Sequence, residues 1–142
     1  MSFQPIRNAI KAKLLDVDSI QQVIDFPSNT FTGYPAAMVT TSRSEAEFNT
    51  TQEDERIYVF TIYIMQEVAV LKEQKSRRVI EGVVDDVLDA FDNDQLLDGV
   101  DLPSNETIII SLPALSQIYN SDDTKYIVGE MEIKVKTQFK IS

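Results

Sequence analysis

The chain has 142 residues, a length that fits one domain over residues 1–142 with a hydrophobic core of its own. It contains no Cys and no His, which excludes disulfides, zinc fingers and any mechanism that needs a thiolate or an imidazole base. The net charge is −10, and no basic residue lies between Arg78 and Lys125, so we expect no direct binding to DNA. Without a signal peptide or a long apolar stretch, we expect a protein made in the cytoplasm with no membrane contact.

The first third of the chain predicts one helix and two strands. Apolar residues at four-residue spacing predict an amphipathic helix from about Gln4 to Leu15, with Ile6, Ile10 and Leu14 on its buried face. Residues 20–26 are typical of a strand that Pro27 ends, and residues 36–41 are typical of a second strand.

Two contrasting segments follow. Residues 42–56 are polar and charged, which predicts a long β-hairpin or a loop at the tip of one. With few apolar anchors, this segment is expected to be mobile in the free subunit. Residues 57–65 are apolar on both faces, so they predict a central strand that is covered on each side.

The main helix is predicted from about Val70 to Phe91, because Val79/Ile80, Val83/Val84, Val87/Leu88 and Phe91 form an apolar stripe at helical spacing. Gly82 interrupts this helix, and we interpret it as a close contact between the helix and the sheet. Basic residues occupy the first half and aspartates the second, which opposes the preference of the helix macrodipole. We therefore expect these charges to face a neighbouring subunit or a lumen.

The last third predicts strands. Asp98-Gly99 indicates a turn, and residues 107–112 predict a strand that Pro113 ends. From Tyr126 to Ile141 apolar and polar residues alternate, which predicts one half-buried strand. Unbroken, this strand would span roughly 50 Å, against a radius of gyration of about 14–15 Å. It must therefore bend, for example at Gly129, or extend beyond its own globule. The whole order predicts an α+β fold with a mostly antiparallel sheet, a long helix packed on one face and a short N-terminal helix.

Two groups of carboxylates suggest a calcium site or a catalytic site. Asp92-Asn93-Asp94 resembles the start of a calcium loop, but Leu97 and Pro103 stand where that loop needs Gly and Glu. Asp85, Asp86, Asp89 and Asp92 could supply the carboxylate pair of a glycosidase, although helical spacing also places Asp85, Asp89 and Asp92 on a solvated surface. We expect no catalytic, cofactor-binding or metal residues, no cofactor and no enzyme.

A resemblance covers nearly the whole chain. Phe31-Thr32-Gly33-Tyr34-Pro35-Ala36-Ala37 leads into a strand, then come Glu45 and Glu47, then Arg56-Ile57-Tyr58-Val59-Phe60. This order, followed by a helix rich in Val and Asp and strands ending in Gly129-Glu130-Met131, resembles the tail terminators and tail-completion proteins of long-tailed bacteriophages.

The resemblance implies a structural virion protein that forms a hexameric ring at the head-proximal end of the tail. Such a protein stops polymerisation of the tail tube and joins tail to head, so its partners would be further copies, the tail-tube protein and a head-completion or connector protein. DNA would only pass through an acidic lumen. By position, the candidate subunit or tube interface is Glu45, Glu47, Phe48, Glu53, Asp54, Arg56, Arg77 and Arg78, and the candidate lumen-facing acids are Asp85, Asp89, Asp92 and Asp94.

The sequence is also compatible with three other functions. A head–tail connector or a tail-tube subunit belongs to the same machine, and a tube subunit would form open filaments rather than a closed ring. An acidic protein that mimics DNA would instead bind a DNA-processing enzyme. A carboxylate-dependent hydrolase is the third.

Overall fold

The computed structural model describes residues 3–25, 33–48, 53–97 and 99–140 and shows an α+β fold. One helix and three strands come first, two helices follow, and two long strands end the described part of the chain. In chain order the elements are α1 (Phe3–Leu15), β1 (Gln22–Asp25), β2 (Ala36–Phe48), β3 (Glu53–Glu67), α2 (Val68–Leu71), α3 (Glu73–Asp92), β4 (Glu106–Asn120) and β5 (Tyr126–Lys140).

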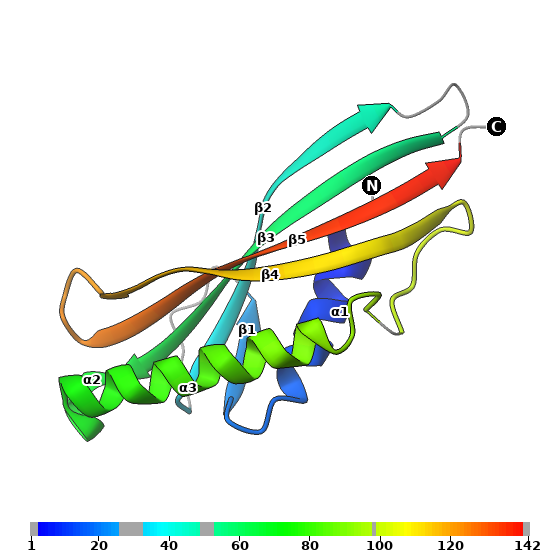
Figure 1. Cartoon of the computed structure of the whole chain (residues 1–142). Coiled ribbons are helices and arrows are strands. Elements are labelled where there is room, and N and C mark those ends of the chain that lie inside the picture. The colour runs from blue at the N-terminus through cyan, green and yellow to red at the C-terminus, as the bar shows by residue number, and fades with distance from the viewer. Residues whose placement is uncertain (1–2, 26–32, 49–52, 98, 141–142) are drawn as a thin grey trace.

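The strands form one sheet in the order β1-β2-β3-β5-β4. Only β1 and β2 pair in parallel; the other pairs are antiparallel, which confirms the predicted mostly antiparallel sheet. The four long strands form a twisted ribbon that continues past the end of α3 at the hairpin between β2 and β3 (Figure 1). The strand predicted from residue 20 begins at Gln22, and Phe26 at its expected end lies outside the described residues.

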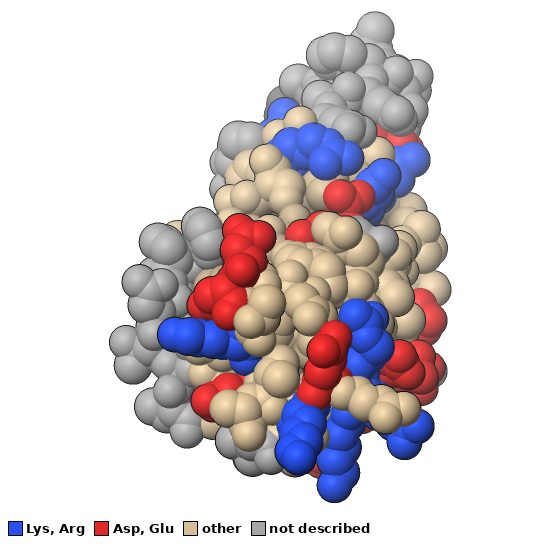
Figure 2. Space-filling model, turned by 90° about the vertical axis from the view of Figure 1, so that its left-hand side faces the viewer, with Lys and Arg blue, Asp and Glu red and all other residues tan. Residues whose placement is uncertain are grey.

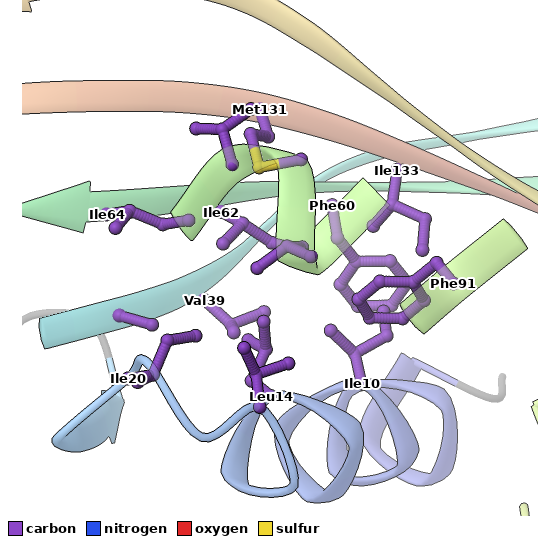
Figure 3. Packing of buried hydrophobic residues seen from close by; sticks show 14 of the residues in the cluster. Ile10, Leu14, Ile20, Val39, Phe60, Ile62, Ile64, Phe91, Met131 and Ile133 are labelled. Carbon is purple, nitrogen blue, oxygen red and sulfur yellow. The ribbon is translucent and has the colours of Figure 1, made fainter. Parts of the chain in front are cut away.

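The core lies between the sheet and the two long helices. Ile6, Ile10 and Leu14 of α1 are fully buried, as their spacing predicted. They meet side chains of the sheet and of α3, and Figure 3 shows Ile10 and Leu14 pointing toward Val39, Phe60 and Phe91. Phe3, in the first turn of α1, packs edge-on against the ring of Tyr58, with 5.0 Å between the centroids.

The prediction of β3 as a central strand is confirmed, but the prediction that both of its faces are covered is wrong. α1 and α3 both pack on the face that carries Phe60, Ile62 and Ile64, so within the described residues no helix covers the opposite face. Val59 points to that opposite face and is nevertheless buried, because its cross-strand neighbours are Arg43 and Lys134. Long charged side chains can cover an apolar neighbour with their stems, which explains why this strand reads as apolar on both faces.

The main helix begins later than predicted. α2 ends at Leu71, Lys72 adopts a left-handed backbone with φ of 65°, and α3 starts at Glu73 rather than at Val70. Apolar periodicity cannot show such a break, because Val70 and Leu71 continue the apolar composition. The predicted stripe is confirmed: Ile80, Val83, Val84, Val87 and Phe91 are buried.

The close contact between helix and sheet lies at Gly129, and the interpretation of Gly82 was wrong. A Cβ on Gly82 would meet nothing within 4 Å, and the residue is exposed. A Cβ on Gly129 would lie 2.9 Å from Ile80 Cγ2. The missing side chain on β5, rather than the one on α3, therefore lets the two layers approach.

β4 is longer than predicted, because Pro113 does not end it. The strand continues to Asn120, and Pro113 lies opposite Ile133 of β5. β4 is an edge strand, where a residue without an N–H is tolerated because its missing donor faces away from the ladder. Two irregularities, at Ile108/Ile110 and Leu115/Gln117, bend the strand along its length.

The hairpin between β2 and β3 confirms the prediction for the polar segment. Pairing runs out to Phe48 opposite Asp54, while residues 49–52 lie outside the described part. β5 confirms the predicted alternation, with Ile127, Met131, Ile133 and Val135 buried; Ile141 is not described.

Candidate assembly surfaces

The hairpin end holds most of the candidate interface residues. Glu45, Glu47 and Phe48 end β2, while Glu53 and Asp54 begin β3. Phe48 lies opposite Asp54 in the register, but the side chains of all five residues lie outside the described part. The hairpin thus brings these five residues together.

Arg56, on the next stretch of β3, makes a contact within the subunit. Its guanidinium carbon lies 5.1 Å above the ring centroid of Phe139 on β5. This cation–π contact holds the arginine beside the sheet, so its charge already has a neighbour within the subunit.

The exposed side of α3 forms a ridge opposite its buried stripe. Helical spacing places Lys75, Arg78, Gly82, Asp85 and Asp89 on this ridge, and all five are exposed. Arg78 therefore points outward, while the neighbouring candidate Arg77 is half-buried at the flank. We call these five residues the outer ridge; it is basic toward α2 and acidic toward the end of α3.

The four candidate lumen acids fall into two groups. Asp85, Asp89 and Asp92 are exposed on α3. Asp94 differs, because its carboxylate lies 2.7 Å from Nζ of Lys13 and its side chain is only 16% exposed. Its charge therefore ties the end of α3 to α1, an ion pair that no local sequence pattern could reveal.

The face of the sheet away from the helices is the second notable surface, which we call the open face. Near α2 it carries a hollow of about 320 Å³ lined mainly by apolar and aromatic side chains. The hollow is lined by Met38, Tyr63, Met65, Tyr119, Ser121, Asp122 and Val128, and we call it the tyrosine–methionine hollow. The strand register explains it, because Met38 lies opposite Tyr63 and Val128 lies between Met65 and Tyr119.

Glu130 lies at the edge of this hollow between the two tyrosines. The hydroxyl of Tyr119 lies 3.5 Å from Oε1 of Glu130, and Tyr63 is the direct cross-strand neighbour of Glu130. Partial burial, together with the carboxylate of Glu130, raises the pKa of both tyrosines, so both stay neutral at physiological pH. The hollow therefore combines neutral aromatic rings with the carboxylate of Asp122 in its lining and that of Glu130 at its edge.

Further along, the open face becomes charged. Arg43 on β2 and Lys134 on β5 both approach Glu132, at 3.8 Å and 3.9 Å. Lys136 pairs with Glu55 at 2.7 Å. Among the described side chains with these ion pairs, three bases meet two acids, in contrast to the hollow with Glu130 and Asp122.

The β4 edge of the sheet carries exposed apolar side chains. Ile109, Leu112 and Leu115 on β4 are 39%, 50% and 43% exposed. An edge strand with exposed apolar side chains is open to pairing with another chain. Among the described residues, the subunit itself contacts this edge where the Ser111 N–H donates to the Gln95 carbonyl at 2.7 Å.

One buried polar cluster was not foreseen. Glu106, only 8% exposed, accepts hydrogen bonds from Thr137 Oγ1 at 2.7 Å and from the Tyr58 hydroxyl at 3.2 Å. Its position opposite Phe139 in the register brings three residues from three strands together. Because the three are far apart in the sequence, no spacing pattern could have shown the cluster.

The carboxylates considered for catalysis or calcium do not form an enclosed site. In the described part of the chain no three acidic side chains are grouped so as to hold a metal ion. Asp85, Asp89 and Asp92 stand in solvent along α3, and Asp86 accepts a hydrogen bond from Ser19 Oγ at 2.8 Å. Across those same described residues, no helix is both long and apolar enough to cross a bilayer.

Comparison with known proteins gives a likeness of structure. No protein-family model and no curated protein sequence matches the chain. The fold is similar to that of a chain in the solved structure of the virion of a native gene transfer agent (GTA) particle, with a TM-score of 0.51. The match covers 99% of this chain and 92% of the other. The likeness is one of fold. At 9% sequence identity it says nothing of the roles of individual side chains.

Proposed function

We propose that the chain is a structural subunit of a phage-like virion, and more specifically a tail terminator that forms a hexameric ring at the head-proximal end of the tail. The observation that carries this proposal is the fold shared over nearly the full length of both chains with a component of the gene transfer agent particle. In this role the ring caps the tail tube, stops its growth and joins it to the head.

Two features of the subunit support an assembly role. A ring needs two unlike surfaces on each copy, because one patch must fit a different patch on the next copy. The outer ridge of α3 and the open face of the sheet are such a pair, and they lie on opposite sides of the molecule. The long β2–β3 hairpin supplies a separate extension suited to contact with the tail tube.

The acidic surface supports the passage of DNA. Asp92 is exposed and is not one of the five residues of the outer ridge, and the chain as a whole carries a charge of −10. A lumen lined by carboxylates repels the phosphates of DNA and so prevents it from adhering to the wall.

The test is the mass of the purified protein by light scattering over a wide range of concentration, with negative-stain images of the same samples. We expect closed rings with six times the 16.1 kDa of one chain, formed either alone or when tail tubes are added. Open filaments would instead identify a tube subunit. A protein that stays monomeric, does not bind tail tubes and binds a DNA-processing enzyme would instead be an inhibitor. Open filaments or such a monomer would each overturn the proposal.

A further inference from the structure

We infer that copies of this chain associate face to back, with the outer ridge of α3 in one copy lying along the open face of the sheet in the next copy. This inference rests on the proposed function and deepens it, because it names the two surfaces that meet within the ring. The occupant of the open face is thus a second copy of the same chain.

The argument begins at the end of the molecule that carries α2. Here the outer ridge presents Lys75 and Arg78, and among the described residues neither forms an ion pair. Figure 2 looks onto this end and shows basic side chains gathered at its lower edge. On the opposite side, at the same end, Glu130 and Asp122 border the tyrosine–methionine hollow.

The charges are reversed at the other end of both surfaces. The ridge there presents Asp85 and Asp89, while among the described side chains in the ion pairs of the open face there, three bases outnumber two acids. α3 runs along β4 in a known direction, since the Asn120 side chain donates to Glu73 and the Ser111 N–H donates to the Gln95 carbonyl. Stacking one copy on the next without a shift therefore places opposite charges against each other at both ends.

The hollow suits a cationic side chain. Two tyrosine rings and two methionines can take up the apolar stem of an arginine, and Glu130 is placed to accept its guanidinium. Arg78 is the exposed arginine of the ridge, so we assign it to the hollow of the neighbouring copy.

Gly82 gives independent support. It lies mid-helix on the ridge next to Arg78, and it has open space where a side chain would be. Glycine disfavours helix formation, and no packing within the subunit requires it here. A second surface that approaches the helix closely accounts for its presence.

Cysteine cross-linking tests the contact directly, because the natural chain has no Cys. Arg78→Cys and Gln117→Cys, in the row of Glu130 on the open face, lie on opposite sides of one copy, so a disulfide between them must join two copies. Under mild oxidation we expect the double variant to form a ladder up to the mass of the ring. The matched pair Arg7→Cys and Gln117→Cys should give none.

A charge swap gives a second readout on the same contact. Arg78→Glu alone and Glu130→Arg alone should each raise the concentration needed for half assembly by roughly tenfold or more. The double variant should recover most of this loss. Arg7→Glu on α1, the same substitution away from the ridge, is the control and should assemble as the natural chain does.

The outcomes separate the two proposals. Rings that form normally with Arg78→Glu, and without a cross-link in the double cysteine variant, would overturn this inference and leave the terminator proposal standing. A natural chain that stays monomeric at all concentrations and with tubes would overturn both. If Glu130→Arg abolished only binding to tubes, the hollow would belong to the tube subunit, and the inference would again be overturned.

Discussion

Gly129 of β5 lies against Ile80 of α3 so closely that a Cβ on the glycine would be 2.9 Å from Ile80 Cγ2. The second nearest atom, Val84 Cγ2, would be 3.1 Å away. Both are methyl groups of β-branched side chains, whose rotamers are restricted in a helix, so neither can move aside cheaply. Gly129→Ala should therefore lower the free energy of unfolding by about 1–3 kcal/mol, as overpacking of a core does. Urea denaturation of the subunit measures this, and an unchanged midpoint would show that α3 can lift from the sheet freely.

Gly82→Ala should have the opposite effect on folding. The residue is exposed in the middle of α3, where alanine favours the helix by about 1 kcal/mol and meets no neighbour. We expect a higher denaturation midpoint for the subunit together with weaker assembly, if the ridge docks closely against a second copy. Urea denaturation and light scattering on the same variant separate the two effects, and stronger assembly would contradict the inferred docking.

Tyr58→Phe should destabilise the subunit by about 1–3 kcal/mol, because it removes a donor from the buried carboxylate of Glu106. Tyr63→Phe is the matched control, since its ring lies on the open face and is only partly buried. The control should change the free energy of unfolding by less than about 0.5 kcal/mol. Equal effects of the two substitutions in thermal or urea denaturation would show that Glu106 does not depend on this hydrogen bond.

Ser121→Ala should raise the pKa of Asp123 toward its ordinary value of 3.8. In the turn before β5, the Ser121 hydroxyl donates to Asp123 Oδ1 at 2.6 Å and lowers the pKa of that carboxyl, and the Lys125 N–H contributes at 3.1 Å. A lowered pKa in the folded state means that the stabilisation is present above pH 3.8 and is lost as the pH falls through the folded value. Titration of the carboxyl carbon by NMR measures the shift, and an identical titration curve in the variant would disprove the role of Ser121.

Local periodicity determined a large part of this fold. The spacing of Ile6, Ile10 and Leu14 defined α1, and the stripe from Ile80 to Phe91 defined the buried side of α3. The strict alternation from Tyr126 defined β5 almost to its last described residue. These patterns are readable because the period of a helix or strand is a property of adjacent residues and does not depend on the partner.

Features that depend on partners could be decided only by the tertiary structure. In the sequence, Pro113 predicts the end of a strand. The structure shows that β4 is an edge strand, where no partner requires an N–H at this position, so the strand continues. Gly82 and Gly129 are each a single glycine inside a predicted helix or strand, so the sequence does not distinguish them. Only the packing of α3 across β5 shows which of them permits a close contact.

The candidate surfaces show the same division. The sequence placed Asp85, Asp89 and Asp92 on one exposed side of a helix, because helical spacing follows from the chain alone. It could not show that Asp94 pairs with Lys13, nor that Met38, Tyr63 and Tyr119 share one hollow. Those groupings join residues far apart in the chain. They form only when burial of the whole core has set the strand register and the face of the sheet on which the helices pack.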